Sequence, residues 1–460
     1  MQNVSQQMPH AQPAIRALMT TNLEAPAPRR LAHAGVISLM IKLAGAVLSY
    51  VSIVAFAHLL DAEQYGRFAF GLNAAIIISA IGNLGTSTGI MRYWPKYLVA
   101  SDPARAKGSV ELGFALAFWG GIALIGLLAL VSAARTHLGF PSEYSFALAI
   151  GLLGLMISIG DYSTNLLRAQ GSTLVSMLPR DVFWRVAAPT LSYLVLHSGL
   201  GLSGTDALLI SALVLLALNL WQGAHIATHV LALGRGLVAI RDFAALRPSL
   251  LPIWMSGIVY AMIQQFDVVI VGSLLSKPEA GAYFAAQKTA LLLSLVLIAG
   301  GLVTAPQMAA LFHAGKLGEL QRLCQKLALA IAATTLLGYL VLIAIGGFLL
   351  RMFDPAFAAA YPILLIVGFG TVVDAISGPN SYLMQMTNYE RPYLKVMLTC
   401  YALVVAAQFI LVPRFGSMGA AYASAGGVIL WNVLVIAFLR RKAKLDPSLL
   451  GVLLPPKAKA

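Results

Sequence analysis

The feature that most constrains this chain is a series of apolar runs, each about 20 residues long, separated by short polar segments. A run of this length can cross the hydrocarbon core of a bilayer as an α-helix. In lipid, only helices and closed barrels satisfy their own backbone hydrogen bonds, and unbroken apolar runs favour helices over alternating strands. Charged residues make up 10% of the chain, whereas a typical soluble domain carries roughly 25%. The sequence therefore predicts an all-α, multi-pass membrane protein.

The apolar runs predict about twelve spans in two sets of six. The first set lies near residues 34–60, 67–88, 111–132, 145–168, 182–199 and 206–230, and the second near 250–275, 281–304, 327–350, 361–384, 394–412 and 418–440. The predicted division of the chain is a tail at 1–33, an N-lobe at 34–231, an inter-lobe loop at 232–249, a C-lobe at 250–441 and a second tail at 442–460.

Basic residues are distributed unevenly between the loops. The formal net charge is +14, and most of the 31 Lys and Arg residues fall in alternate loops. Basic loops face the cytosol in membrane proteins, so this pattern predicts that both termini lie in the cytosol. We expect the membrane to be a bacterial inner membrane. We interpret Arg29 and Arg30 as an anchor for the first span rather than as an export signal. The same pattern explains the positive charge without a nucleic-acid partner.

The two halves of the chain contain a similar motif. A Leu-Leu pair, a Gly and an aromatic residue occur at Leu59-Leu60, Gly66 and Phe68, and again 215 residues later at 274–283. A weaker match joins 167–172 to 383–388, at an offset of 216. Both motifs lie at span ends, which indicates a duplicated six-span unit. Two such units share one orientation, so their pseudo-twofold axis is expected to run along the membrane normal, with a substrate cavity between the lobes.

These motifs, together with Phe266-Asp267 before Val-Ile-Val-Gly272 and Met91-Arg92-Tyr93 after the second span, give the chain a family resemblance. The chain resembles the multidrug/oligosaccharidyl-lipid/polysaccharide (MOP) flippase superfamily over about residues 34–441, and most of all the Wzx-type oligosaccharide flippases. The resemblance implies a MATE-like pair of six-helix lobes that works by alternating access. It also implies a polyprenyl-diphosphate-linked oligosaccharide as cargo for lipopolysaccharide or exopolysaccharide biosynthesis, with a polymerase and chain-length proteins as partners besides the membrane lipids.

Two differences from members of the superfamily reduce the range of cargo molecules that we expect. Its lipid II flippases look like proteins with more spans than the twelve predicted here. Many of its drug antiporters carry a carboxylate in the first span, where this chain has Lys42. The second difference weakens the hypothesis of a cation-coupled drug antiporter.

Ionisable residues inside spans are costly, so they are candidates for a cavity. Polar residues at helical spacing form one stripe in each of three spans: Ser38, Lys42, Gly45, Ser49 and Ser52; Ser158, Asp161, Asn165 and Arg168; and Ser256, Tyr260, Gln264 and Asp267. The candidate cations for the diphosphate of the cargo are Lys42, Arg168, Lys288 and Arg92. Lys42 and Lys288 are equally compatible with snorkelling or ion pairing, and Arg92 and Arg168 with anchoring at the cytosolic rim.

Three acids complete the candidate site: Asp267, Asp161 and Asp374. Each could bind a coupling H+ or Na+, or balance a neighbouring cation. Asp374 precedes Gly378-Pro379, where the sequence predicts a helix break or a kink. Asp181 and Arg185 are four residues apart, which predicts an ion pair within one helix.

No catalytic motif is present, and His225 and His229 lack the Glu that a zinc-protease helix carries after its first His. We therefore expect a transporter rather than an enzyme, with no metal and no cofactor beyond a coupling ion. The favoured hypothesis is a flippase for lipid-linked oligosaccharides. A drug antiporter of the same architecture and a non-transporting scaffold for polysaccharide enzymes are the alternatives. A glycosyltransferase or polymerase would be expected to carry large catalytic loops, and none is evident.

Overall fold

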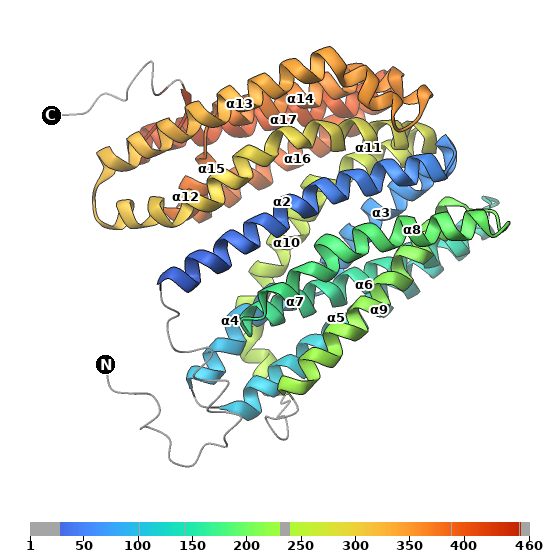
Figure 1. Cartoon of the computed structure of the whole chain (residues 1–460), viewed down its shortest axis with the longest axis horizontal. Helices are drawn as coiled ribbons and strands as arrows, with labels where there is room; N and C mark the ends of the chain where they lie inside the picture. The colour runs from blue at the N-terminus through green and yellow to red at the C-terminus, as the bar shows by residue number, and fades with distance from the viewer. Residues whose placement is uncertain are drawn as a thin grey trace. The chain divides into compact units, whose positions relative to one another are not determined.

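A computed structural model describes residues 28–230 and 240–451, apart from residues 101, 142, 388 and 450. All regular structure in these residues is helical (Figure 1). Most of the predicted tail at 1–33, residues 452–460 of the second tail and residues 231–239 of the predicted inter-lobe loop lie outside the described residues, as do the side chains of Arg29, Arg30 and His229.

Eleven segments of the described chain are long and apolar enough to cross a membrane. They are Met40–Leu59, Ala62–Gly82, Pro103–His137, Tyr144–Ala169, Gly204–Thr228, Leu250–Leu274, Lys277–Gly301, Leu317–Arg351, Pro355–Ile376, Arg391–Phe415 and Ser417–Ala443. This confirms the predicted all-α, multi-pass fold. The predicted span at 182–199 is absent from this set: its helical segment carries three charged residues, Arg180 and Asp181 just before the predicted span and Arg185 near its start.

The helices of the first half of the chain are α2 (Pro28–Leu59), α3 (Ala62–Gly82), α4 (Thr86–Val99), α5 (Pro103–His137), α6 (Tyr144–Ala169), α7 (Thr173–Leu178), the π-turn η2 (Pro179–Phe183), α8 (Trp184–His197) and α9 (Gly204–Val230). Those of the second half are α10 (Ile240–Leu274), α11 (Lys277–Leu291), η4 (Leu292–Ser294), α12 (Leu295–His313), α13 (Leu317–Arg351), η5 (Pro355–Ala360), α14 (Tyr361–Ile376), α15 (Asn380–Met386), α16 (Glu390–Phe415), α17 (Ser417–Phe438) and the π-turn η6 (Leu439–Ala443).

The described residues group into two compact units. The first contains the chain up to Leu60 and from Arg67 to Phe266, and the second contains Asp61–Gly66 and the chain from Asp267 onward. In the first unit, α5, α6 and α9 pack together around Tyr162, whose hydroxyl donates to the carbonyl of Val110 at 3.2 Å. In the second unit, α14 packs against α13 and α17, and α17 against α16 (Figure 1).

The repeated sequence motif is also a repeated structure. Helices α2 and α3 are separated by Leu60 and Asp61, and α10 and α11 are separated by two residues at the equivalent places, 215 positions later. Each joint begins its second helix with a side-chain cap. The Asp61 carboxylate accepts from the Gln64 N–H at 2.8 Å, and the Ser276 hydroxyl accepts from the Glu279 N–H at 3.4 Å. In both places the joint consists of the second Leu of the pair and one polar residue, and it forms the same turn.

The glycine that follows each joint at the same spacing has a steric reason. In the second unit, a Cβ added to Gly66 would lie 1.8 Å from the carbonyl oxygen of Lys277, and one added to Gly281 would lie 3.1 Å from the Cα of Gly66. The starts of α3 and α11 therefore approach each other at distances that a side chain at Gly66 does not allow. Tyr65, which is buried, packs beside them against the rings of Phe284 and Phe357.

We expect the Gly66→Ala variant to fold poorly, because its Cβ would collide with backbone rather than with a movable side chain. Overpacking costs roughly 1–3 kcal/mol where neighbours can adjust, and here the carbonyl of Lys277 is fixed in a helical turn. The yield of monodisperse protein in detergent and its thermal midpoint measure the effect. The matched control is Gly126→Ala in α5, where nothing lies within 4 Å of the added Cβ. Equal yields for the two variants would contradict the packing of these joints.

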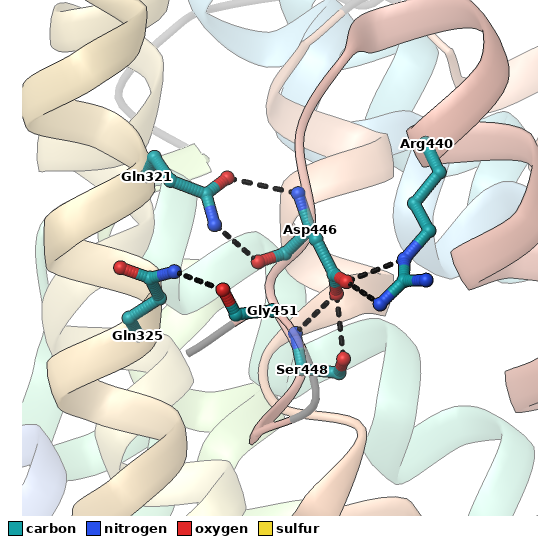
Figure 2. A network of polar contacts seen from close by, with 6 residues as sticks. All are labelled: Gln321, Gln325, Arg440, Asp446, Ser448 and Gly451. Carbon is teal, nitrogen blue, oxygen red and sulfur yellow. Dashed lines mark hydrogen bonds and ion pairs between the residues drawn. The ribbon is translucent and has the colours of Figure 1, made fainter. Parts of the chain in front are cut away.

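The end of the described chain is bound to the second unit by a polar network (Figure 2). Asp446 is fully buried, and its carboxylate accepts from the guanidinium of Arg440 and from the N–H and hydroxyl of Ser448, at 2.9 and 2.6 Å. Gln321 of α13 accepts from the Asp446 N–H at 2.8 Å and donates to its carbonyl. Gln325, one turn further, donates to the carbonyl of Gly451 at 2.8 Å. We call residues 444–451 the C-terminal strap.

Candidate functional site

The first polar cluster lies in the first unit, where α2 meets η2. Lys42 is 48% exposed and forms an ion pair with Asp181, with its Nζ 2.9 Å from Oδ2 and 3.2 Å from Oδ1. Gly45, one turn along α2, permits this approach, because a Cβ there would lie 2.9 Å from the Cβ of Asp181. The predicted ion pair within one helix between Asp181 and Arg185 does not form at contact distance: the carboxylate binds Lys42 of another helix and acts on Arg185 only from further away.

A second ion pair joins η2 to α6. Arg180, the residue before Asp181, binds the carboxylate of Asp161, and both side chains are about one-third exposed. The helix widens here into a π-turn, in which the N–H of Trp184 donates to the carbonyl of Pro179. Single π-turns within helices often occur at functional sites. The π-turn presents adjacent residues of opposite charge, one to α6 and one to α2.

Arg185 is the third cation of this region, and unlike Lys42 and Arg180 it contacts an aromatic ring rather than a carboxylate. Its guanidinium lies over the indole ring of Trp184, 4.4 Å from the ring centroid. Within the described part of the chain, no carboxylate lies within ion-pairing distance of Arg185. The side chain lines a groove of about 560 Å³ between α2 and α8. We call Lys42, Asp161, Arg180, Asp181 and Arg185 the basic cluster; its three cations exceed its two carboxylates by one charge.

The other predicted cations of this unit lie outside the basic cluster. Arg92 is exposed on α4, beside the buried Tyr93 and Trp94, and Arg168 is exposed in the last turn of α6. Neither forms an ion pair with a residue of the basic cluster in the described structure. Sequence reasoning therefore identified Lys42 and Asp161, paired Arg185 with Asp181, and did not single out Arg180.

The second polar cluster lies in the second unit around Asp267, which is 6% exposed. Its Oδ2 accepts from the hydroxyls of Ser424 at 2.7 Å and Tyr283 at 3.0 Å. Its Oδ1 accepts from the amide of Gln408 at 2.6 Å, and the amide of Gln287 lies 3.5 Å from Oδ2. These partners come from α11, α16 and α17, so one carboxylate of α10 ties together four helices. We call this group the Asp267 cage.

The Asp267 cage holds acceptors that the described structure leaves without a hydrogen-bond partner. They are the side-chain oxygens of Gln287 and Gln408, which are both buried. An amide whose N–H₂ group donates to a carboxylate keeps its carbonyl oxygen available to accept from a donor or to bind a cation. Lys288, the predicted cation next to Gln287, lies over the ring of Phe284 with its Nζ 5.2 Å from the centroid. The donor set of carboxylate and amide oxygens suits H+ or a hard cation such as Na+.

The third predicted acid, Asp374, lies beside a break between α14 and α15. Helix α14 ends at Ile376, Gly378 has a φ of 70°, and α15 begins at Asn380. Asn432 of α17 bridges the break: it donates to Asp374 at 2.9 Å and accepts from the amide of Asn380. The Gly378 position also touches the C-terminal strap, since a Cβ there would lie 2.2 Å from the carbonyl oxygen of Pro447. The structure thus shows the helix break that the Gly-Pro pair indicated.

Comparison with known proteins finds solved structures with a similar fold. The chain is similar in structure to an inward-facing multidrug resistance MATE family transporter of the MOP superfamily, with a TM-score of 0.69, 13% identity, and coverage of 94% of this chain and 98% of the other. An outward-facing structure with the same description gives a TM-score of 0.61, 13% identity, and coverage of 94% and 98%. A MOP superfamily transporter from Pyrococcus furiosus, described as having a binding pocket of reversed polarity that suggests a different function, gives 0.63, 14%, 94% and 98%. Neither a protein-family model nor a curated protein sequence matches the chain.

These likenesses establish that the chain has the fold of MATE transporters of the MOP superfamily. Together with the eleven apolar helices, they identify it as a multi-pass integral membrane protein.

Proposed function

We propose that this chain is a flippase of the Wzx type, which carries a polyprenyl-diphosphate-linked oligosaccharide across the bacterial inner membrane by alternating access. The observation that carries the proposal is the basic cluster of the first unit. It holds Arg185, a guanidinium without a carboxylate partner among the described residues, at the edge of a groove of about 560 Å³. A cation that contacts no carboxylate inside a membrane protein is costly and is a candidate for binding an anion.

The chemistry of the cluster suits a diphosphate. A diphosphate does not cross hydrocarbon unaided, because burying an unpaired charge is prohibitive. A guanidinium binds phosphate oxygens through two parallel N–H donors, and an ammonium adds a point charge. The ion pairs Lys42–Asp181 and Arg180–Asp161 keep the cluster close to neutral in the absence of cargo. Arg185 supplies the attraction, and Lys42, which is half exposed, can turn from its carboxylate toward the phosphate.

The Asp267 cage supports a second element of the proposal, coupling to H+ or Na+. Its carboxylate has four neutral donors around it, and the amide oxygens of Gln287 and Gln408 are available to a cation. Polar groups at membrane depth that converge on one carboxylate are typical of coupling-ion sites in transporters. Asp374 and Lys288 are further members of this proposal. The remaining elements, cytosolic termini and a polysaccharide polymerase and chain-length proteins as partners, follow from the family resemblance and from the distribution of basic loops.

The alternative candidate is a cation-coupled drug antiporter, with which the fold is equally compatible. The similar solved structures include multidrug transporters, and one MOP transporter among them is described as having a pocket of reversed polarity and a different function. The fold therefore accommodates pockets of either charge. The excess cation of the basic cluster favours an anionic cargo over a cationic drug.

Binding by purified protein tests the proposed cargo. We expect the Arg185→Ala variant to bind a short-chain prenyl-diphosphate sugar at least about tenfold more weakly than the wild type, because one charge-assisted contact contributes about 1.5–3 kcal/mol. Arg185→Lys should lose less affinity, because it keeps the charge. Arg322→Ala, which removes an exposed arginine of α13, serves as the control. Unchanged affinity of Arg185→Ala, measured by native mass spectrometry, would contradict the proposed site.

A further inference from the structure

The groove that Arg185 enters is a defined feature of the first unit. It runs between α2 and α8, which supply one wall each, and its volume is about 560 Å³. The α2 wall is formed by Leu48, Val51 and Ala55, and the α8 wall by Val186, Pro189 and Leu196. The wall of α2 extends from Leu48 to Leu59, which corresponds to about 16 Å of helix. This length exceeds that of any side chain and suits an extended hydrocarbon chain.

The local sequence explains why the two helices leave this space. Pro189 has no N–H, so the carbonyl of Arg185, four residues earlier, loses its helical hydrogen bond. A proline inside a helix favours a bend at that point. Ala55 and Ser52 on the facing side of α2 are small and do not fill the space. An apolar channel therefore begins at the basic cluster and continues along the helices.

The groove is amphiphilic along its length. At one end lies the guanidinium of Arg185, within one turn of the Lys42–Asp181 pair on η2. The middle is mostly aliphatic, with Ser52 and Thr190 as its polar side chains, and the far end carries the rings of Tyr193 and His197. There, the ring of His197 stacks on Tyr193 at 4.0 Å and bonds to its carbonyl at 3.0 Å. A cation at one end of an aliphatic channel complements a lipid that has an anionic head and a hydrocarbon tail.

We propose that the α2–α8 groove holds the prenyl chain of the lipid-linked cargo while its diphosphate is bound at Arg185. The inference rests on the proposed function, which supplies a prenyl diphosphate as cargo, and it adds a site for the tail. Burying a hydrocarbon chain contributes no large hydrophobic term in a membrane, since lipid tails are equally apolar. The groove therefore selects its lipid by shape and by the charge at its end. Binding of the tail in the groove also holds the diphosphate next to the cations.

Photo-crosslinking on the two faces of α8 tests this site. Thr190 and Tyr193 line the groove, whereas Leu191 and Leu194 lie on the same helix and do not; all four residues are exposed, Tyr193 by 49% and Leu191 by 45%, so the two sets are matched in exposure. Benzoylphenylalanine is placed at each position in full-length protein, which is reconstituted with phospholipid and a radiolabelled short-chain prenyl-diphosphate sugar. We expect the two groove positions to label about tenfold more than the two matched positions, and Arg185→Ala to reduce that difference.

Three results would overturn the inference. Equal labelling of both faces would show that the tail is ordinary lipid around the protein. Labelling of the groove by phospholipid that excess prenyl diphosphate does not displace would assign the groove to a structural lipid. The proposed function survives either result if Arg185→Ala still weakens cargo binding, so the two failures are distinguishable. Absence of any labelling by the probe, together with absence of binding, would remove both proposals.

Discussion

The Asp267→Ala variant is expected to lose ion-coupled transport and to lower the free energy of unfolding by at least about 3 kcal/mol. The alanine removes the acceptor for Ser424, Tyr283 and Gln408, which lie within 3.0 Å of the carboxylate and are buried or partly buried. Leaving a buried donor without a partner costs about 1–3 kcal/mol for each group. Several donors lose their partner at once, so the effect is larger than that of a typical surface substitution.

The Asp267→Asn variant separates the expected loss of ion coupling from the expected loss of stability. The amide keeps the shape of the side chain but removes the negative charge, so the fold should be largely retained while a cation loses its charged ligand. In wild-type protein, we expect the thermal midpoint in detergent to rise with Na+ or to change with pH, according to the coupling ion. We expect no such dependence in Asp267→Asn. Asp206→Asn, which alters a capping carboxylate at the start of α9, is the control. An ion response that persists in Asp267→Asn would contradict a coupling role for the cage.

The Asp446→Ala variant is expected to lower the free energy of unfolding by about 3 kcal/mol and to release the C-terminal strap. Asp446 is fully buried, and its removal leaves the guanidinium of Arg440 without its carboxylate. Breaking a buried ion pair costs about 3–5 kcal/mol. The lower end applies here because Arg440 is 38% exposed and can turn toward water.

Hydrogen exchange over residues 439–451 measures strap release directly. We expect faster exchange in Asp446→Ala and, to a smaller extent, in Gln321→Ala, because Gln321 holds the backbone of Asp446 on both sides (Figure 2). Exchange should also increase around Gly378, which the strap touches through the carbonyl of Pro447. Arg441→Ala, which alters the exposed neighbour of Arg440, is the matched control. Identical exchange in Asp446→Ala and Arg441→Ala would show that the network does not hold the strap.

The sequence predicted the architecture well because the bilayer imposes it. The length of each apolar run sets the helix, and the repeated Leu-Leu, Gly and aromatic pattern marks joints that the structure forms twice with the same local geometry. The predicted span at 182–199 differs from a typical span because the charged pair Arg180 and Asp181 directly precedes it in η2 and forms ion pairs with neighbouring helices. Its polarity reflects its role in the basic cluster, which a count of apolar residues does not reveal.

The candidate site was harder to predict because its pairs are distant in the sequence. Asp181 is bound by Lys42, 139 positions away in the sequence, whereas helical spacing predicted Arg185 as the partner of Asp181. Gln408 and Ser424 lie in largely apolar helices, 141 and 157 positions from Asp267. Polar residues within a span are candidates for function, but only the packing of α16 and α17 shows that these two meet one carboxylate. Asp267 was identified from sequence because it ends a polar stripe on its own helix.

Translocation by reconstituted protein tests the proposed function most directly. Proteoliposomes would be loaded with a fluorescent short-chain prenyl-diphosphate oligosaccharide, and in parallel with a permanently cationic dye, and the transfer of each would be followed by a quencher that does not cross the membrane. We expect wild-type protein to transfer the anionic lipid at least about tenfold faster than Arg185→Ala and to leave the dye in place. Transfer of the dye without the anionic lipid, or equal rates for wild type and Arg185→Ala, would contradict a flippase that recognises its cargo through the basic cluster.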